Sequence, residues 1–158
     1  MAAPTPLQAF FARYDGFDYN NTAPPTREFG RLAKLYKWKK NTPAKEAAYK
    51  AFCTALVLEF NAGFGTDTKD LNVWQGLCAR VRINPLPDSI TGCRKALRRT
   101  HVNLIDLVAT LSTGRPVKTF TTVNSLRQYT ISTKKFFPKE DENAGNLLKY
   151  LLRGIVTT

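Results

Sequence analysis

The chain has 158 residues, of which 43% are hydrophobic, and its 24 Lys and Arg against 12 Asp and Glu give a net charge of +12. This length and hydrophobic content allow one domain with its own core, and they exclude a disordered chain or one that needs disulfides or metals to fold. The excess of cations favours an anionic partner.

The three cysteines, Cys53, Cys78 and Cys93, lie at apolar helical positions and have no close CxxC spacing. This pattern fits buried thiols in a reducing compartment better than a disulfide framework. The first residues contain neither a basic region nor an apolar run of signal-peptide length, and no stretch approaches the roughly 20 apolar residues of a membrane span. We therefore expect a cytoplasmic or nuclear protein that does not associate with membranes.

Residues 1–24 are expected to form an N-terminal arm that packs on the rest of the chain. A short helix is predicted over residues 7–14, and a turn-rich stretch with interleaved aromatic side chains follows at residues 15–22. These rings could stack on bases, but Arg13 is the one cation here against Asp15 and Asp18. We therefore interpret the aromatic side chains as groups that hold the arm to the core.

A strongly basic segment follows, in which Pro24 and Pro25 open a helix. The apolar side of this helix contains Phe29, Leu32, Leu35 and Tyr36. A basic stripe on the same helix contains Arg27, Arg31 and Lys34, and it continues into Lys37, Lys39 and Lys40. From residue 27 to residue 50 the chain has eight cations and two acids, so this segment supplies half of the net charge.

Two further helices are predicted from their first residues. Thr42 and Pro43 suit the cap and first position of a helix through about residue 60, which is apolar on several sides and is expected to be buried. Asp70 is a plausible cap for a helix over residues 70–81, whose apolar side chains recur every three or four residues. The prolines at 85 and 87 lack amide donors, so the chain must turn after this helix.

A helix over residues 89–111, capped by Asp88 or Ser89, is expected to be the central element. Its apolar residues fall within one arc at about 100° per residue, and its second half is apolar around most of its circumference, which indicates burial. Gly114 and Pro116 supply the end signal. The other side of the first half carries the densest basic cluster of the chain, Arg94, Lys95, Arg98 and Arg99.

The remainder of the chain predicts an extended segment and two helices. Residues 117–120 alternate in character, Thr122 can cap a helix over residues 124–133, and the acids at 140–142 precede a last helix. We find no internal repeat or linker. The sequence therefore predicts an all-α, single-domain bundle of about six helices around a central buried helix near residues 89–111, with residues 1–24 as the arm and residues 25–158 as the helical domain.

Five motifs carry a resemblance that covers most of the chain: FFARY at residues 10–14, EFGRL at 28–32, WQGLC at 74–78, HVNLIDL at 101–107 and AGNLL at 144–148. The chain resembles a family of small uncharacterised proteins that are widespread in filamentous fungi. The resemblance implies no activity, cofactor or catalytic residue. Many members of this family are less basic, so nucleic-acid binding is either a trait of this chain or its charge is incidental.

No motif for catalysis or metal binding emerges from the sequence. Cys93 and His101 are eight residues apart in the predicted helix, about 12 Å along its axis, which is too far for a nucleophile and its base. The Cys and His spacings match no common zinc motif, and Gly63 and Gly65 lack the context of a phosphate loop. We therefore expect no enzyme activity, catalytic residue, cofactor or metal. Asp106, near Asn103 in an apolar stretch, is expected to form a structural hydrogen bond.

The favoured hypothesis is a non-enzymatic helical domain that binds nucleic acid, DNA or RNA, or another polyanion through basic helix faces. The alternative is a protein-interaction or structural module with an acidic protein partner. The loop of about eight residues between the helices at 70–81 and 89–111 is too long for a typical helix-turn-helix, so sequence-specific reading is disfavoured. The candidate phosphate-binding residues are Arg94, Lys95, Arg98, Arg99, Arg27, Arg31, Lys34, Lys37, Lys39 and Lys40, with Trp38 as a possible stacking platform.

Overall fold

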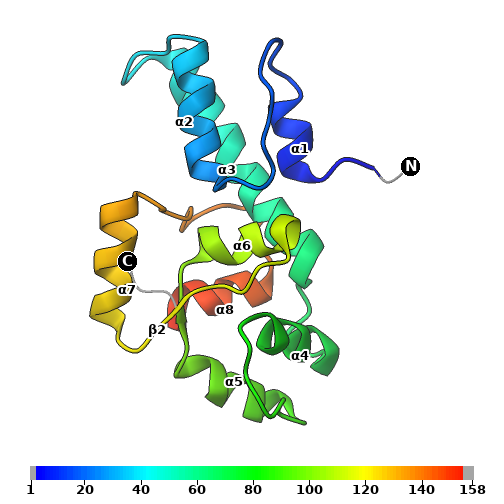
Figure 1. Ribbon diagram of the computed structural model, residues 1–158. Helices are drawn as coiled ribbons and strands as arrows, with labels where there is room; N and C mark the ends of the chain where they lie inside the picture. Colours follow the sequence, from blue (N-terminus) through cyan, green and yellow to red (C-terminus); the bar gives the residue numbers. More distant parts are fainter. Residues whose placement is uncertain (1–2, 155–158) are drawn as a thin grey trace.

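The computed structural model describes residues 3–154, which form eight helices and one two-stranded sheet (Figure 1). In chain order the elements are α1 (Pro6–Phe11), α2 (Pro25–Leu35), α3 (Pro43–Phe64), α4 (Leu71–Arg80), α5 (Ile90–Arg98), β1 (His101–Val102), α6 (Leu104–Thr113), β2 (Thr119–Phe120), α7 (Val123–Thr133) and α8 (Asn146–Gly154). The predicted helical class is therefore confirmed, although the structure describes eight helices where about six were expected.

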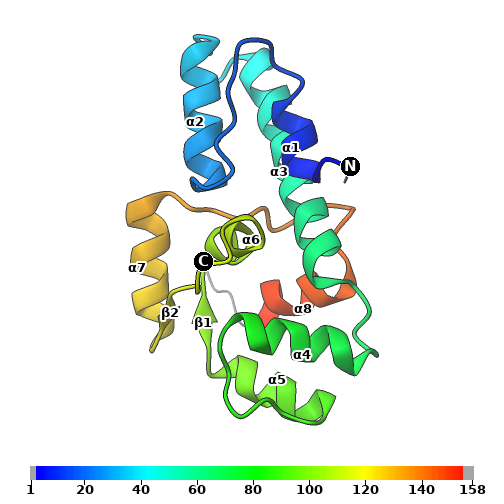
Figure 2. The same cartoon turned by 45° about the vertical axis from the view of Figure 1, so that its right-hand side comes forward.

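The longest element, α3, has 22 residues and contacts α1, α2, α4 and α6. Figures 1 and 2 show α1 and α2 beside its first half, and α4, α6 and α8 grouped around its other end. Pro43 occupies the first turn, as predicted, and the helix continues past residue 60 to Phe64. Gly65 then ends it at a φ of 89°, which a residue with a side chain adopts only with strain. The helix α3 therefore contacts elements at both ends of the molecule.

The prediction of one continuous helix over residues 89–111 is wrong. The chain leaves α5 after Arg98, pairs as β1, and starts α6 at Leu104. The Asn103 side chain accepts a hydrogen bond from the Asp106 amide at 3.2 Å and so caps a new helix, which a residue in a helix interior does not do. The half of the predicted helix that was expected to be buried corresponds to α6, while α5 buries Cys93 and Leu97 on one side.

The segment between α5 and α6 pairs with β2 as a short antiparallel ladder. His101 lies opposite Phe120 and Val102 lies opposite Thr119, so β1 is paired with the segment that was predicted to be extended. Val102 is buried, and its β-branched side chain suits a strand better than a helix. The backbone groups between α5 and α6 therefore find partners across the ladder instead of along a helix.

The N-terminal arm is part of the core, as expected from its aromatic residues. Leu7, Phe10 and Phe11 are buried, and the Phe11 ring stacks on Tyr19 with a centroid separation of 4.3 Å. The buried Glu59 carboxylate accepts the Leu7 amide at 3.0 Å, which fixes α1 against α3. These rings are occupied by packing and are not presented as an open stacking surface.

Most predicted caps are confirmed, and one predicted apolar face is corrected. Asp70, Ser89 and Thr122 each accept an amide hydrogen bond at the start of α4, α5 and α7. Leu35 and Tyr36 were expected on the buried side of α2, but they are 50% and 37% exposed at the end of the helix. The end of α2 therefore presents apolar side chains next to lysines.

Candidate nucleic-acid interface

The candidate cations form two surfaces that do not lie together. We define the α2–α3 surface as Arg27, Lys34, Lys37, Lys39 and Lys40, and the α5 surface as Lys95, Arg98 and Arg99. Figures 1 and 2 place α2 at one end of the molecule and α5 at the opposite end, and the two views agree. The structure therefore does not bring the two basic segments together on one face.

The α2–α3 surface is built from the end of α2 and the loop that leads into α3. All five of its cations are exposed. Lys37 and Asn41 have positive φ angles of 55° and 64°, and these two residues turn the chain between the helices. The Thr42 hydroxyl donates to the Lys39 carbonyl at 2.8 Å, which fixes the end of the loop. The lysines are thus carried on an ordered backbone.

Arg31 was predicted to contact phosphate, but its side chain is already engaged. Its guanidinium binds the Glu28 carboxylate at 2.8 Å, donates to the Asp18 carbonyl at 2.7 Å and lies over the Phe17 ring. Burial acts to raise the pKa of Glu28, but the hydrogen bonds from Arg31 and the Asn20 amide outweigh it, so that the pKa is lowered. Arg31 therefore helps to hold the N-terminal arm on α2.

Trp38 also has a packing role. The half-buried indole lies 5.6 Å from the Tyr14 ring, 5.5 Å from Tyr36 and 6.3 Å from Phe29, measured between centroids. Aromatic neighbours at these separations contribute to stability. The residue proposed as a stacking platform is thus surrounded by other rings, and stacking on a base stays a prediction.

Acids offset part of the charge beside the α2–α3 surface. A hollow of about 550 Å³ between the start of α3 and the segment before α8 has four lysines and three acids in its lining. These residues are Lys40, Lys45, Lys50, Lys139, Glu46, Glu140 and Asp141. The other cations of the α2–α3 surface, Arg27, Lys34, Lys37 and Lys39, lie outside this lining.

The α5 surface lacks one of its predicted members. Lys95, Arg98 and Arg99 are exposed, and the cations in the last turn of α5 are favoured by the helix dipole. Arg94 is half-buried instead, with its guanidinium carbon 5.2 Å from the Trp74 centroid and 5.5 Å from the Tyr150 centroid. Its buried Nε has no hydrogen-bond partner among the described residues. Arg94 therefore links α5, α4 and α8 and is not an open phosphate ligand.

The polar pair Asn103 and Asp106 makes structural hydrogen bonds, as predicted. Asp106 accepts the Tyr129 hydroxyl at 2.6 Å and binds the Lys135 ammonium at 2.9 Å, and Lys135 also reaches the Tyr129 oxygen at 2.7 Å. Burial acts to lower the pKa of Lys135, but these hydrogen bonds outweigh it and raise the pKa. The three groups satisfy one another and tie α6 to α7.

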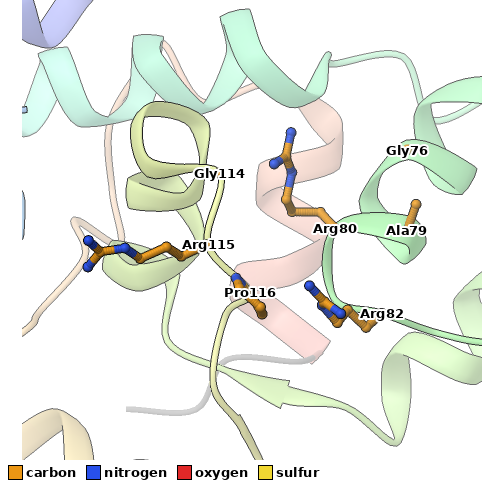
Figure 3. Close-up of a pocket in the computed structure, with 7 residues that line it drawn as sticks. All are labelled: Gly76, Ala79, Arg80, Arg82, Gly114, Arg115 and Pro116. Carbon is orange, nitrogen blue, oxygen red and sulfur yellow. The ribbon is translucent and has the colours of Figure 1, made fainter. Parts of the chain in front are cut away.

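A third set of cations, which no sequence pattern predicted, comes together in the folded chain. Arg80, Arg82 and Arg115 line a hollow of about 370 Å³, together with Gly76, Ala79, Gly114 and Pro116 (Figure 3). Arg80 is the last residue of α4 and Arg82 follows two residues later, whereas Arg115 lies on the loop after α6. Arg115 is far from Arg80 and Arg82 in the sequence, so the three residues do not stand out as a group. The pair Arg80 and Arg82 at the end of the predicted helix was the one local indication of this site.

The structure offers little for metal or thiol chemistry within the described residues. Cys53, Cys78 and Cys93 are free, and no group of three or more His, Cys, Asp or Glu side chains in residues 3–154 is placed to hold a metal. Burial raises the pKa of the Cys78 thiol. None of the described helices combines the length and apolar character that a membrane crossing requires.

Comparison of the chain with protein-family models, with curated proteins and with solved structures finds no match. The resemblance to a fungal family therefore stays a prediction. The fold defines a basic, mostly helical protein, and any functional assignment depends on its surfaces.

Proposed function

We propose that this protein is a non-enzymatic domain that binds nucleic acid or another polyanion through the α2–α3 surface and the α5 surface. One observation carries the proposal: among the side chains that the structure describes, residues 3–152, Arg31 and Lys135 are the only Lys or Arg side chains that form ion pairs. The cations of both surfaces are exposed and have no carboxylate partner. Such side chains are available to replace the counterions that surround a phosphate backbone.

The separation of the surfaces shapes the mode of binding. Because they lie at opposite ends, the two surfaces can contact two segments of one nucleic acid at the same time, or they can bridge two strands (Figures 1 and 2). Residues 81–89 form a loop between α4 and α5 that is too long for a compact helix-turn-helix. Backbone contacts without base reading are therefore the expected mode.

Charge-reversal variants test this proposal. Lys37, Lys39 and Lys40 are changed to Glu in one variant, and Lys95, Arg98 and Arg99 in another. The matched control changes Lys69, Arg127 and Lys149 to Glu, since these cations are also exposed and lie on neither surface. Affinity for a labelled 20-base-pair duplex is measured by fluorescence anisotropy at low salt, and helical content is checked by circular dichroism.

Each surface variant is expected to bind at least about tenfold more weakly than the control variant, because three contacts are reversed while the net charge is equal. If both surface variants bind as well as the control, these surfaces are not the interface. If the wild-type protein does not bind at low salt, polyanion binding itself is refuted.

An acidic protein partner is the second candidate, and the exposed apolar residues beside the α2–α3 surface favour it. Leu35 and Tyr36, at 50% and 37% exposure, adjoin Lys34 and Lys37. A nucleic-acid surface has no need of an exposed leucine, whereas protein interfaces combine apolar contacts with a charged rim. Capture of an acidic protein that survives nuclease treatment and is lost in Leu35→Ser supports this candidate, and loss of all captured material on nuclease treatment excludes it.

A further inference from the structure

One face of α4 is lined with small side chains and ends in a cation. Asn72, Val73, Gly76, Ala79 and Arg80 recur at helical spacing and so share one side of the helix. The opposite side is buried through Trp74, Leu77, Cys78 and Val81. Because Gly76 and Ala79 have small side chains or none, the middle of the outer face of α4 is not covered by side-chain atoms.

Two hollows meet on this face. The first, of about 370 Å³, lies between the end of α4 and the loop after α6, and the second, of about 390 Å³, lies between the start of α4 and the end of α3. Gly76 and Arg80 line both hollows. The two hollows therefore adjoin along α4, and we call them together the α4 groove.

The first end of the α4 groove is cationic. Figure 3 shows the Arg82 side chain directed toward Pro116, the Arg80 side chain extending toward α3, and the Arg115 side chain extending away on the other side of its loop. None of the described residues that line either hollow is acidic. Arg80 and Arg82 have no ion-pair partner among the described residues, and guanidinium groups bind phosphate oxygens in a bidentate manner, so this end suits an anionic group.

The second end of the α4 groove is formed by backbone and by apolar groups. Gly63, Phe64 and Gly65, at the end of α3, face Asn72 and Val73 at the start of α4. The missing side chain of Gly65 lets its backbone lie close to Val73, Asn72 supplies a side-chain amide, and Val73 supplies apolar contact. This end suits an uncharged organic group rather than a second anion.

We propose that the α4 groove binds a small organic phosphate, with its phosphate between Arg80 and Arg82 and its uncharged part across Gly76 toward Val73. The groove has the volume typical of small-molecule sites, which distinguishes it from the open basic surfaces at the two ends of the molecule. Gly76 is the residue that keeps the path between the two hollows open. The inference is independent of polyanion binding, since it uses none of the residues of the α2–α3 or α5 surface.

Gly76→Leu is the direct test, and Gly30→Leu is its matched control. A Cβ added at either glycine meets no other atom within 4 Å, and both residues are exposed in helix interiors. Both variants are therefore expected to fold, with helices at least as stable as in the wild-type protein, because leucine favours a helix more than glycine does. Only Gly76→Leu places a side chain in the groove.

The probes are adenosine 5′-monophosphate, ribose 5-phosphate, inorganic phosphate and adenosine, each titrated by calorimetry into wild-type protein and variants. We expect saturable binding of the two organic phosphates with a dissociation constant of about 1 mM or lower, and weaker binding of inorganic phosphate and of adenosine. Gly76→Leu and Arg80→Gln should each weaken the binding of adenosine 5′-monophosphate at least about tenfold, and Gly30→Leu should leave it unchanged.

Three results would overturn the inference. The first is that neither organic phosphate binds to the wild-type protein. The second is that Gly76→Leu binds adenosine 5′-monophosphate as tightly as Gly30→Leu does, which places any site outside the groove. The third is that adenosine binds as tightly as its monophosphate, which removes the role of Arg80 and Arg82.

Discussion

Replacement of Asn103 by alanine tests how the break between α5 and α6 is held. The buried Asn103 amide donates to the Thr130 hydroxyl at 3.1 Å and to the Lys135 carbonyl at 3.0 Å, and its oxygen accepts the Asp106 amide at 3.2 Å. Loss of an N-cap costs about 1 kcal/mol, and each acceptor left unpaired in a buried site costs about 1 kcal/mol or more. We therefore expect Asn103→Ala to lower the free energy of unfolding by about 3 kcal/mol.

Urea unfolding followed by circular dichroism measures this change, with Ser89→Ala as the control. Ser89 caps α5 but is exposed and makes one such bond, to the Gly92 amide at 3.0 Å, so about 1 kcal/mol is expected. Asn103→Asp keeps the cap and loses both donors, which predicts a cost of about 2 kcal/mol. If Asn103→Ala costs no more than Ser89→Ala, the hydrogen bonds to Thr130 and Lys135 do not hold α6 in place.

Three other measurements probe packing, pH dependence and thiol burial. Arg94→Ala should lower the free energy of unfolding by about 1–2 kcal/mol, because contacts with two aromatic rings are lost. Lys95→Ala, the control, should change it by less than about 0.5 kcal/mol. Equal effects of the two substitutions would contradict the packed position of Arg94. Because the pKa of Glu28 is lowered in the fold, its charged form stabilises the protein above pH 4.5, and this contribution is lost as the pH falls further. The difference in unfolding free energy between wild type and Glu28→Gln should therefore shrink in acid. A difference that stays constant with pH would contradict the lowered pKa. Cys78 should resist iodoacetamide at pH 8 in the native protein and react in guanidinium chloride, as read by mass spectrometry, and rapid native labelling would contradict its burial.

Local signals were enough to predict most helix starts. Asp70 and Thr122 accept amides within three residues, and Pro43 occupies the first turn of α3, so these effects are visible in the sequence. Thr42 occupies the N-cap position of α3, but its side chain makes no capping hydrogen bond. The break near Asn103 was not visible in the same way. Leu97 and Leu104 are seven residues apart, which is two helical turns, so the apolar pattern continues across the break as if the helix did.

The arrangement of the candidate surfaces required the three-dimensional structure. The sequence identified exposed cations on α2 and α5, but their placement at opposite ends depends on the path of α3 between them (Figure 1). Arg31 and Arg94 looked equivalent to their neighbours in the sequence, and only tertiary contacts with Glu28 and Trp74 separate them from the open cations. The α4 groove combines residues from three segments, so no single stretch of sequence indicates it.

The central claim is that cations on two separate surfaces replace counterions on a polyanion, and the salt dependence of binding tests it most directly. Affinity for the labelled duplex is measured from low to moderate salt for the wild-type protein and for the two surface variants. The wild-type logarithm of affinity should fall steeply with the logarithm of salt concentration, and each triple variant should lower the slope by about 2–3, in proportion to three lost phosphate contacts. A slope near zero in the wild type, or one that neither surface variant changes, would contradict the account.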